Sequence, residues 1–482
     1  MNHLLKTIMC GLGATLTAFA AFAQSSQPQW LTDTIPGQWS YTSPYNQKLP
    51  NDDEWWKTFG DSSLDSLINM AIDRNYNLAA AVKRIDMARR TVEVAKGAYF
   101  PTINLNAGWT KGQSSGTTDP VPEKADPYSY FSIGASAQWE IDLFGKITEN
   151  VKANKAAYNA TRAEYEATMV ALAANVAKAY INLRTYQNEL LVANNHLAEQ
   201  TKVLAIVEAR FKAGLASMLD VTQSKIVVAS TKATIPPLQA MIESTINSIA
   251  LLTACYPQEI DGWLGTPAPM PEIKYGAQLG VPADLLRRRP DIIRAEYELA
   301  EYAAQAGIAK KDFLPTLSIT GSISTEAHNA KNLFTGRSIS WEVAPTLSWT
   351  VFDGLARSNR VASAKAQLEA SIDNYNFTVM QAVVEVQNAT TTFKSAMKTI
   401  ELTADVIDES RRSLDLAVQL YKKGLSPFNN VVDAQLSFIS NQDSQITAQG
   451  KALTAVVNLY EALGGGWKSG ESDLSARTIN YK

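Results

Sequence analysis

Two stretches of the sequence run for a long distance without proline or glycine. Ile147 to Ala213 is one stretch of 67 residues, and Leu355 to Lys423 is another of 69. Both are rich in Ala, Leu, Glu and Lys, which favour helix. At about 1.5 Å per residue, each would form a helix roughly 100 Å long. Rods of this length do not fit inside a compact globule and indicate a coiled-coil or tubular assembly.

Each long stretch is followed by a glycine and a shorter helical stretch. The turns at Gly214 and Gly424 predict that helices at 217–255 and 427–463 return antiparallel to those at 147–213 and 355–423. Pro236-Pro237 is expected to interrupt the first return helix, because proline lacks the backbone N–H that the helix needs.

The chain contains two copies of one pattern. Phe100-Pro101-Thr102 recurs as Leu314-Pro315-Thr316, 214 positions later, while Trp139 recurs as Trp349 and Gly214 as Gly424, 210 positions later. We predict a repeat at 63–258 and, after a linker, a second within 259–463. The segment 24–62 and the tail 464–482 flank them.

Each copy also carries two runs in which every second residue is apolar. They predict strands at about 102–112 and 129–143 in the first copy, and at about 315–325 and 338–352 in the second. Ile133 and Ile319 lie on the apolar side. The alternation alone fits a half-buried sheet as well as a set of transmembrane strands. Trp109, Tyr128, Tyr130, Trp139, Trp341 and Trp349 lie in or beside the strands and suit either sheet packing or an interfacial aromatic girdle.

The amino terminus has the form of a secretory signal. Lys6 precedes an apolar stretch that ends at Ala21-Phe22-Ala23, so residues 1–23 are predicted to be removed before Gln24. Cys10 belongs to this signal, which leaves Cys255 without an intrachain partner.

The strands, rods and signal together require an assembly. Transmembrane strands must close into a barrel, and about eight is the minimum, so the four strands of this chain must be shared with other copies. Three chains would supply twelve strands above a tube of helices.

Composition excludes several classes of function. A net charge of -3 gives no basic surface for nucleic acid, and the three histidines, His3, His196 and His328, offer little for imidazole catalysis or a metal site. No catalytic motif is present, and Gly464 to Gly466 has the wrong context for a phosphate loop. We expect no enzyme activity and no cofactor.

Several short motifs occur in the order found in a known family. They are Trp55-Trp56-Lys57-Thr58-Phe59-Gly60-Asp61, Trp139-Glu140-Ile141-Asp142-Leu143-Phe144-Gly145, Arg288-Arg289-Pro290-Asp291 with Ala295-Glu296, Phe352-Asp353-Gly354, and Leu463-Gly464-Gly465-Gly466-Trp467. Over nearly the whole mature chain the sequence resembles the TolC-like outer membrane factors, the trimeric channels of tripartite efflux and type I secretion systems. The Arg-Arg-Pro-Asp segment is similar to the drug-efflux branch, which includes OprM- and NodT-like proteins.

The resemblance implies an α+β membrane protein. Three chains would share a twelve-stranded barrel in the outer membrane of a Gram-negative bacterium, continued by a long periplasmic α-helical barrel. A mixed equatorial belt would come from 24 to about 62, from about 256 to 290, and from the tail after Leu463. The implied partners are two further copies of the chain, a periplasmic adaptor, outer membrane lipid and, indirectly, an inner-membrane RND-type pump. Family members are commonly lipidated at a cysteine after the signal, and this sequence has none there.

The resemblance also assigns residues. Arg210, Gly214 and Gly424 match the helix tips that meet the adaptor, although a basic residue before a glycine is also an ordinary helix end. Asp220 and Tyr421 match gate residues. Asp433 matches a carboxylate ring at the pore constriction, where Asn430 replaces a second carboxylate of some relatives; each Asp is otherwise a solvated surface charge.

The expected function is a passive exit duct for small molecules such as drugs. Two alternatives remain: the outer membrane component of type I protein secretion, or a soluble periplasmic scaffold of long coiled coils.

Overall fold

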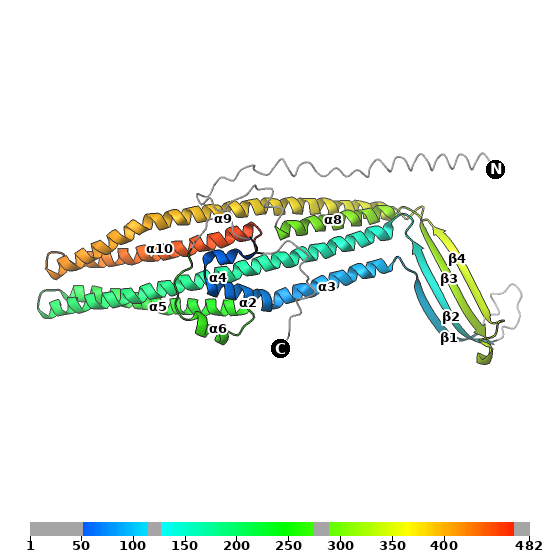
Figure 1. The fold of residues 1–482 in the computed structure, drawn as a ribbon, viewed down its shortest axis with the longest axis horizontal. Coiled ribbons are helices and arrows are strands. Elements are labelled where there is room, and N and C mark those ends of the chain that lie inside the picture. Colours follow the sequence, from blue (N-terminus) through cyan, green and yellow to red (C-terminus); the bar gives the residue numbers. More distant parts are fainter. Residues whose placement is uncertain (1–51, 114–126, 273–288, 467–482) are drawn as a thin grey trace, which may run out of the picture.

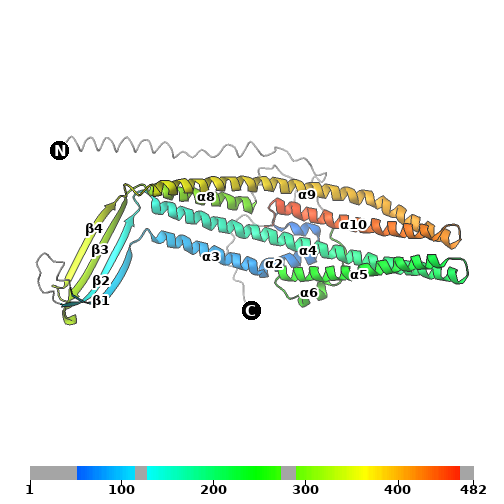
Figure 2. The same ribbon diagram turned by 180° about the vertical axis from the view of Figure 1, so that it is seen from behind.

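The computed structural model describes residues 52–113, 127–272 and 289–466. Helices run side by side along the long axis of the molecule. A four-stranded sheet lies at one end, and the turns that connect pairs of helices lie at the other (Figures 1 and 2). The expected signal at 1–23, most of the 24–62 segment, part of the linker and the tail beyond 466 lie outside the described residues.

Two helical hairpins form the body. The long helices are α4 (Lys146–Lys212) and α9 (Ala356–Lys422), each of 67 residues. The return helices are α5 (Met218–Leu252) and α10 (Phe428–Ala462), each of 35 residues. These ends lie within a few residues of those expected from the sequence.

The helices of the two copies begin and end at equivalent residues. The bounds of α4 and α9 differ by 210 at both ends, and so do those of α5 and α10. The shorter helices α3 (Tyr76–Gly97) and α8 (Pro290–Lys311) differ by 214 at both ends. Equivalent positions in the two copies can therefore be compared directly.

The expected break at Pro236-Pro237 is wrong, because α5 continues through both prolines. Each proline leaves the carbonyl four residues earlier without its helical donor. Those carbonyls belong to Lys232 and Ala233, and all four residues are exposed. Since water can bond exposed carbonyls, the helix loses two hydrogen bonds without burying an unsatisfied group.

The sheet pairs its strands antiparallel in the order β1-β2-β3-β4, with both outer edges open within one chain. The strands are β1 (Thr102–Gln113), β2 (Pro127–Ile141), β3 (Thr316–Ala327) and β4 (Ile339–Ser348), and the short η3 (Ala330–Asn332) lies between the last two. The two repeats meet at β2 and β3, so the sheet joins both copies.

The register sorts the side chains onto two chemically different faces. The apolar face carries Ile103, Leu105, Ala107, Trp109, Phe131, Ile133, Ala135, Trp139, Ile319, Ile323, Trp341 and Val343. The polar face carries mainly Ser, Thr, Asn, Gln and Glu. Because the side-chain period of a strand is two, this register keeps every large apolar residue on one side.

The aromatic residues divide between these faces. Trp109, Trp139 and Trp341 lie on the apolar face, where an interfacial girdle is possible. Tyr128 and Tyr130 lie on the polar face with their ring centroids 6.1 Å apart, so a lipid-facing girdle does not include them.

The sheet is fastened to the helices in the same way in both repeats. Trp139 Nε1 donates to the carbonyl of Tyr99 at 2.9 Å, and Trp349 Nε1 donates to that of Phe313 at 2.9 Å. Lys311 crosses between the repeats and donates to the carbonyl of Gly145 at 2.9 Å. The orientation of the sheet on the helical body is therefore fixed from both copies.

The largest apolar core lies midway along the body. There η2 (Asp52–Phe59), α2 (Ser62–Arg74) and α6 (Pro257–Leu264) pack against α4, α5 and α10 (Figure 1). Trp55 is fully buried and stacks on Tyr460 at 5.2 Å. Asp61 caps α2 and accepts a hydrogen bond from the Tyr180 hydroxyl at 2.6 Å. Burial and then Asp61 raise the pKa of Tyr180 to about 12, so this hydroxyl remains a donor.

Candidate functional site

The two hairpins end in turns with the same backbone geometry. Gly214 and Gly424 have φ angles of 76° and 74°. In the first turn the N–H of Leu215 donates to the carbonyl of Arg210 at 2.8 Å, and the second turn repeats this bond at 2.9 Å. Such a helix end needs a left-handed residue, for which glycine has the lowest cost. Both turns lie at the end of the molecule opposite the sheet (Figure 1).

Arg210 joins the two tips. Its Nη1 donates to the carbonyl of Lys422, the last residue of α9, at 2.6 Å. Its Nη2 donates to the carbonyl of Leu215 at 3.3 Å, and the guanidinium lies 5.0 Å from the ring centroid of Tyr421. A cation at a helix C-terminus satisfies a free carbonyl and offsets the negative end of the helix dipole. Arg210 therefore holds the first tip against the second.

Tyr421 and Asp220 meet beside this arginine. The Tyr421 hydroxyl donates to Asp220 Oδ2 at 3.2 Å, and Ser217 Oγ lies 2.8 Å from the other carboxylate oxygen. The Tyr421 ring is buried against Phe428, with ring centroids 5.1 Å apart. Burial, followed by the negative charge of Asp220, raises the pKa of Tyr421. The structure thus brings together five of the residues selected from the sequence.

The two constriction candidates lie outside this group. Asn430 Nδ2 donates to Ser426 Oγ at 2.9 Å in the first turn of α10. Asp433 is exposed on α10, and it forms no ion pair with any residue that the structure describes. Its carboxylate therefore faces solvent in a single chain.

Sequence reasoning missed a pair of joints between helices. Asn75, which caps α3, donates through Nδ2 to the carbonyl of Leu252 at the end of α5, at 2.9 Å. Arg289 occupies the equivalent position before α8 and donates through Nη1 to the carbonyl of Ala462 at the end of α10, at 2.8 Å. Each joint connects a return helix to the short helix that continues towards the sheet. The motif around Arg289 marked the position but not the partner.

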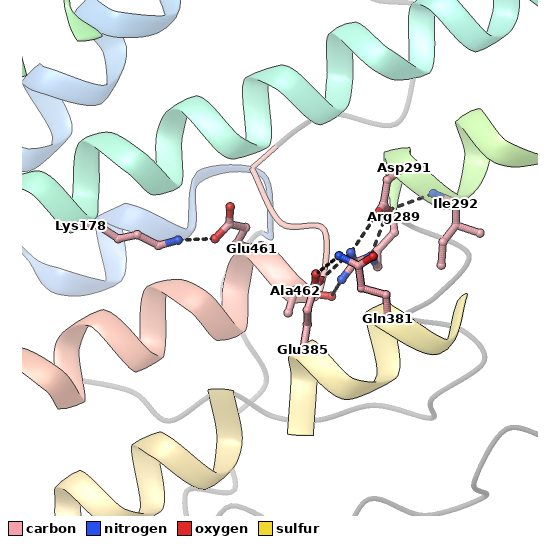
Figure 3. A network of polar contacts seen from close by, with 8 residues as sticks. All are labelled: Lys178, Arg289, Asp291, Ile292, Gln381, Glu385, Glu461 and Ala462. Atoms are coloured by element: carbon pink, nitrogen blue, oxygen red, sulfur yellow. Dashed lines mark hydrogen bonds and ion pairs between the residues drawn. The ribbon is translucent and has the colours of Figure 1, made fainter. Parts of the chain in front are cut away.

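The Arg289 joint is ionic (Figure 3). Nη2 lies 2.6 Å from Asp291 Oδ2 and 2.8 Å from Glu385 Oε2, while Nε donates to Asp291 Oδ1 at 3.0 Å. Burial opposes the charge of Arg289, but the two carboxylates outweigh it and raise the pKa of the guanidinium. This one side chain therefore links α8, α9 and α10. Nearby, Lys178 on α4 forms an ion pair with Glu461 on α10 at 2.6 Å, which connects α4 to the same group of helices.

Comparison with known proteins identifies the fold. A family model described as outer membrane efflux protein matches residues 67–254 and 281–465, one range for each copy of the duplication. The chain belongs to this family.

Individual relatives match over most of their length. Outer membrane protein OprJ of Pseudomonas aeruginosa is 28% identical over 467 residues, which cover 96% of this chain and 97% of that protein. Nodulation protein T of Rhizobium leguminosarum bv. trifolii is 28% identical over 416 residues, which cover 86% and 88%. The solved outer-membrane channel OprN is 29% identical with a TM-score of 0.86, covering 90% of this chain and 97% of that one.

These matches confirm several expectations. The chain is an outer membrane channel protein of the OprM/NodT branch with a large periplasmic part. Its fold class is confirmed: an α+β membrane protein that contributes four strands to a trimeric barrel continued by a helical barrel. Within the described residues, no helix is long and apolar enough to cross a membrane.

Proposed function

We propose that three copies of this chain form a passive duct that carries small molecules from the periplasm to the exterior. The observation that carries this proposal is the sheet, whose register gives one apolar and one polar face and which continues into two long hairpins. Closed around three chains, it encloses a polar channel within an apolar outer wall. The duct takes its energy from an inner-membrane RND-type pump, reached through a periplasmic adaptor.

The names of relatives support small solutes over proteins. Two Pseudomonas putida relatives, each 28% identical, are a solvent efflux pump and a toluene efflux pump outer membrane protein. A Pseudomonas aeruginosa relative, 27% identical, is a pyoverdine export outer membrane protein. These names refer to different exported substances, which suits a duct whose specificity lies upstream.

The adaptor binds at the paired tips in this proposal. Gly214 and Gly424 set the shape of the turns, and Arg210 holds them together. Around them the structure exposes large apolar side chains, namely Phe211, Leu215, Met218, Leu219 and Leu425. A pair of turns that exposes several large apolar side chains suits contact with another protein.

The pore closes at the same end. The Asp220–Tyr421 hydrogen bond holds α5 to the end of α9 and forms part of the gate. Three copies of Asp433 form the charged ring of the constriction, and Asn430 adds no charge to it. The division into a signal, two repeats, an equatorial belt and a tail belongs to the same proposal.

A pair of neighbouring substitutions tests the duct. Ile133 on the apolar face and Ser132 on the polar face are each changed to arginine in a strain that depends on this chain for export. Ile133→Arg should cost about 2–4 kcal/mol near the bilayer midplane, whereas a charge facing the channel is tolerated. We expect Ile133→Arg alone to lose detergent-extracted trimer and export of dyes and antibiotics.

Three outcomes would contradict the proposal. Equal trimer yield in both variants would place the sheet outside the membrane. Extraction of the wild-type chain by buffer alone would support the coiled-coil scaffold. Loss of a secreted protein with unchanged export of small molecules would support type I secretion.

A further inference from the structure

Three carboxylates lie on the polar face of the sheet. Glu140 on β2 pairs with Ser318, Glu342 on β4 pairs with Ser322, and Glu326 lies on β3 itself. All three are exposed. Within β1 to β4 this face carries no lysine, arginine or histidine, and the described residues supply no ion pair to any of the three. The face is therefore acidic along its length.

The carboxylates occupy separate levels along the strands. Their positions on β3 are residues 318, 322 and 326, so neighbouring levels lie four residues apart. At about 3.3 Å per residue this is roughly 13 Å. The Debye length is about 10 Å at 0.1 M salt. Three copies of the chain would repeat these carboxylates around a barrel, so its polar face carries negative charge from its helical end to its outer end.

The polar face points inward if the apolar face meets lipid, so this step rests on the proposed duct. Twelve strands about 4.8 Å apart and tilted by about 40° enclose a barrel roughly 24 Å across the backbone. Side chains that reach inward from such a wall lie within about a Debye length of the axis. The carboxylates therefore attract or repel a charged solute on the axis, because low-dielectric walls concentrate their electric field in the water.

We propose that Glu140, Glu342 and Glu326 make the outer barrel a second charge filter, which favours organic cations over organic anions independently of Asp433 at the other end of the duct. Rings of acidic side chains are the usual basis of cation preference in channels. The stacked rings of Tyr128 and Tyr130 lie on the same face near its outer end. Aromatic faces also attract organic cations, so they reinforce the preference.

The electrostatic potential inside the outer barrel can be measured by chemical modification, without passing an ionic current along the whole duct. In a Cys255→Ser background, Ser324→Cys places one thiol on the polar face, between the levels of Glu342 and Glu326. Intact cells are treated from outside with a trimethylammonium or a sulfonate methanethiosulfonate of similar size. The measured quantity is the ratio of the cationic to the anionic modification rate.

The expected results separate charge from structure. Glu140→Gln, Glu326→Gln and Glu342→Gln together should lower the ratio by about tenfold. The matched Glu→Asp variant keeps all three charges and should retain most of the ratio. Near 1 M salt, where the Debye length is about 3 Å, all variants should converge. An unchanged ratio in the Gln variant at low salt would overturn the charge filter.

A second thiol distinguishes this failure from failure of the duct. Ile323→Cys lies next to Ser324 but on the apolar face, where aqueous reagents should react slowly. Fast modification of Ser324→Cys alone, with an unchanged ratio in the Gln variant, would overturn only the charge filter. Equal modification at both positions would show that no barrel separates lumen from lipid and would overturn the proposed duct and the filter together.

Discussion

The two copies of the duplication share a backbone and differ in how their side chains hold it together. In the first copy the neutral Asn75 bonds the end of α5, and in the second the charged Arg289 bonds the end of α10. Asn75 also caps its own helix, whereas Arg289 reaches α9 through Glu385. Both copies thus supply a side-chain donor for a carbonyl at the end of the return helix. The second copy adds an ion pair between Arg289 and Glu385 on the long helix α9.

The tips show the same contrast. At an offset of 210, Asp220 corresponds to Asn430, Tyr421 to Phe211, and Arg210 to Leu420. The backbone of the two turns is alike, yet each polar contact occurs once. The hairpins are therefore not interchangeable, and any separation of the tips would break contacts between unlike residues.

Among the contacts that differ between the two copies, loss of the ionic joint should have the largest effect. Arg289→Ala removes the bond to Ala462 and leaves Asp291 and Glu385 facing each other. Hydrogen bonds to a charged group contribute about 1.5–3 kcal/mol, and partial exposure of both carboxylates reduces the repulsion that remains. We expect a lower temperature of trimer dissociation in detergent. Arg294→Ala, which removes an exposed i,i+4 pair on the same helix, is the control; an equal shift would refute a special role for Arg289.

Loss of the neutral joint should cost less. Asn75→Ala removes a cap and the bond to Leu252, a loss of about 1–2 kcal/mol. Asn75→Asp keeps the capping oxygen but cannot donate, so it should lie between wild type and Asn75→Ala in the same dissociation assay. A larger effect at Asn75 than at Arg289 would reverse the comparison between the copies.

Loss of the Tyr421–Asp220 hydrogen bond at the tips should have a smaller effect. Tyr421→Phe removes one hydroxyl, a loss of about 0.5–1.5 kcal/mol in each chain, and should raise resting conductance in planar bilayers. Wild-type conductance in Tyr421→Phe would remove this contact from the gate.

The smallest effect should be a difference in acid sensitivity. His196 is buried against Phe438, whereas the equivalent Val406 is exposed. Burial lowers the pKa of His196, and Glu199, Asp443 and Gln442 only partly oppose it. The folded state thus favours neutral imidazole, and its contribution to stability is full above the ordinary pKa of about 6.5 and declines as pH falls below it.

Substitution of His196 tests this sign. The wild-type dissociation temperature should fall between pH 7 and pH 5, and His196→Gln should show a smaller fall. Val406→His, at an exposed site, should leave the wild-type pH profile unchanged. Identical profiles for wild type and His196→Gln would show that other groups control the acid response.

The sequence predicted what depends on periodicity. The long helices, the four strands and the duplication were visible because proline-free runs and alternating residues mark them directly. The two turns were visible because a glycine at a fixed offset marks each of them, whereas Arg210, Asp220 and Tyr421 were selected from the family resemblance. The sheet register could not be obtained in this way, and it was needed to place Glu140, Glu342 and Glu326 on one face.

The joints were missed because their partners are remote and partly backbone. Arg289 bonds the carbonyl of Ala462, 173 positions away, and no side-chain pattern identifies a carbonyl as an acceptor. The prolines were misjudged for a related reason. Whether a freed carbonyl breaks a helix depends on its exposure, which only the packed structure reveals.

Pro236 and Pro237 give the two return helices, α5 and α10, unequal stiffness. The positions in α10 that correspond to Pro236 and Pro237 are Ile446 and Thr447, which keep their backbone N–H groups. Bending resistance in a helix comes from its ladder of hydrogen bonds, and proline positions are where helices kink. We therefore expect α5 to bend more easily than α10, and to bend at its two prolines. A displacement of the tips should be absorbed partly within α5, whereas α10 should pass it on to the contacts of Arg289 at its other end.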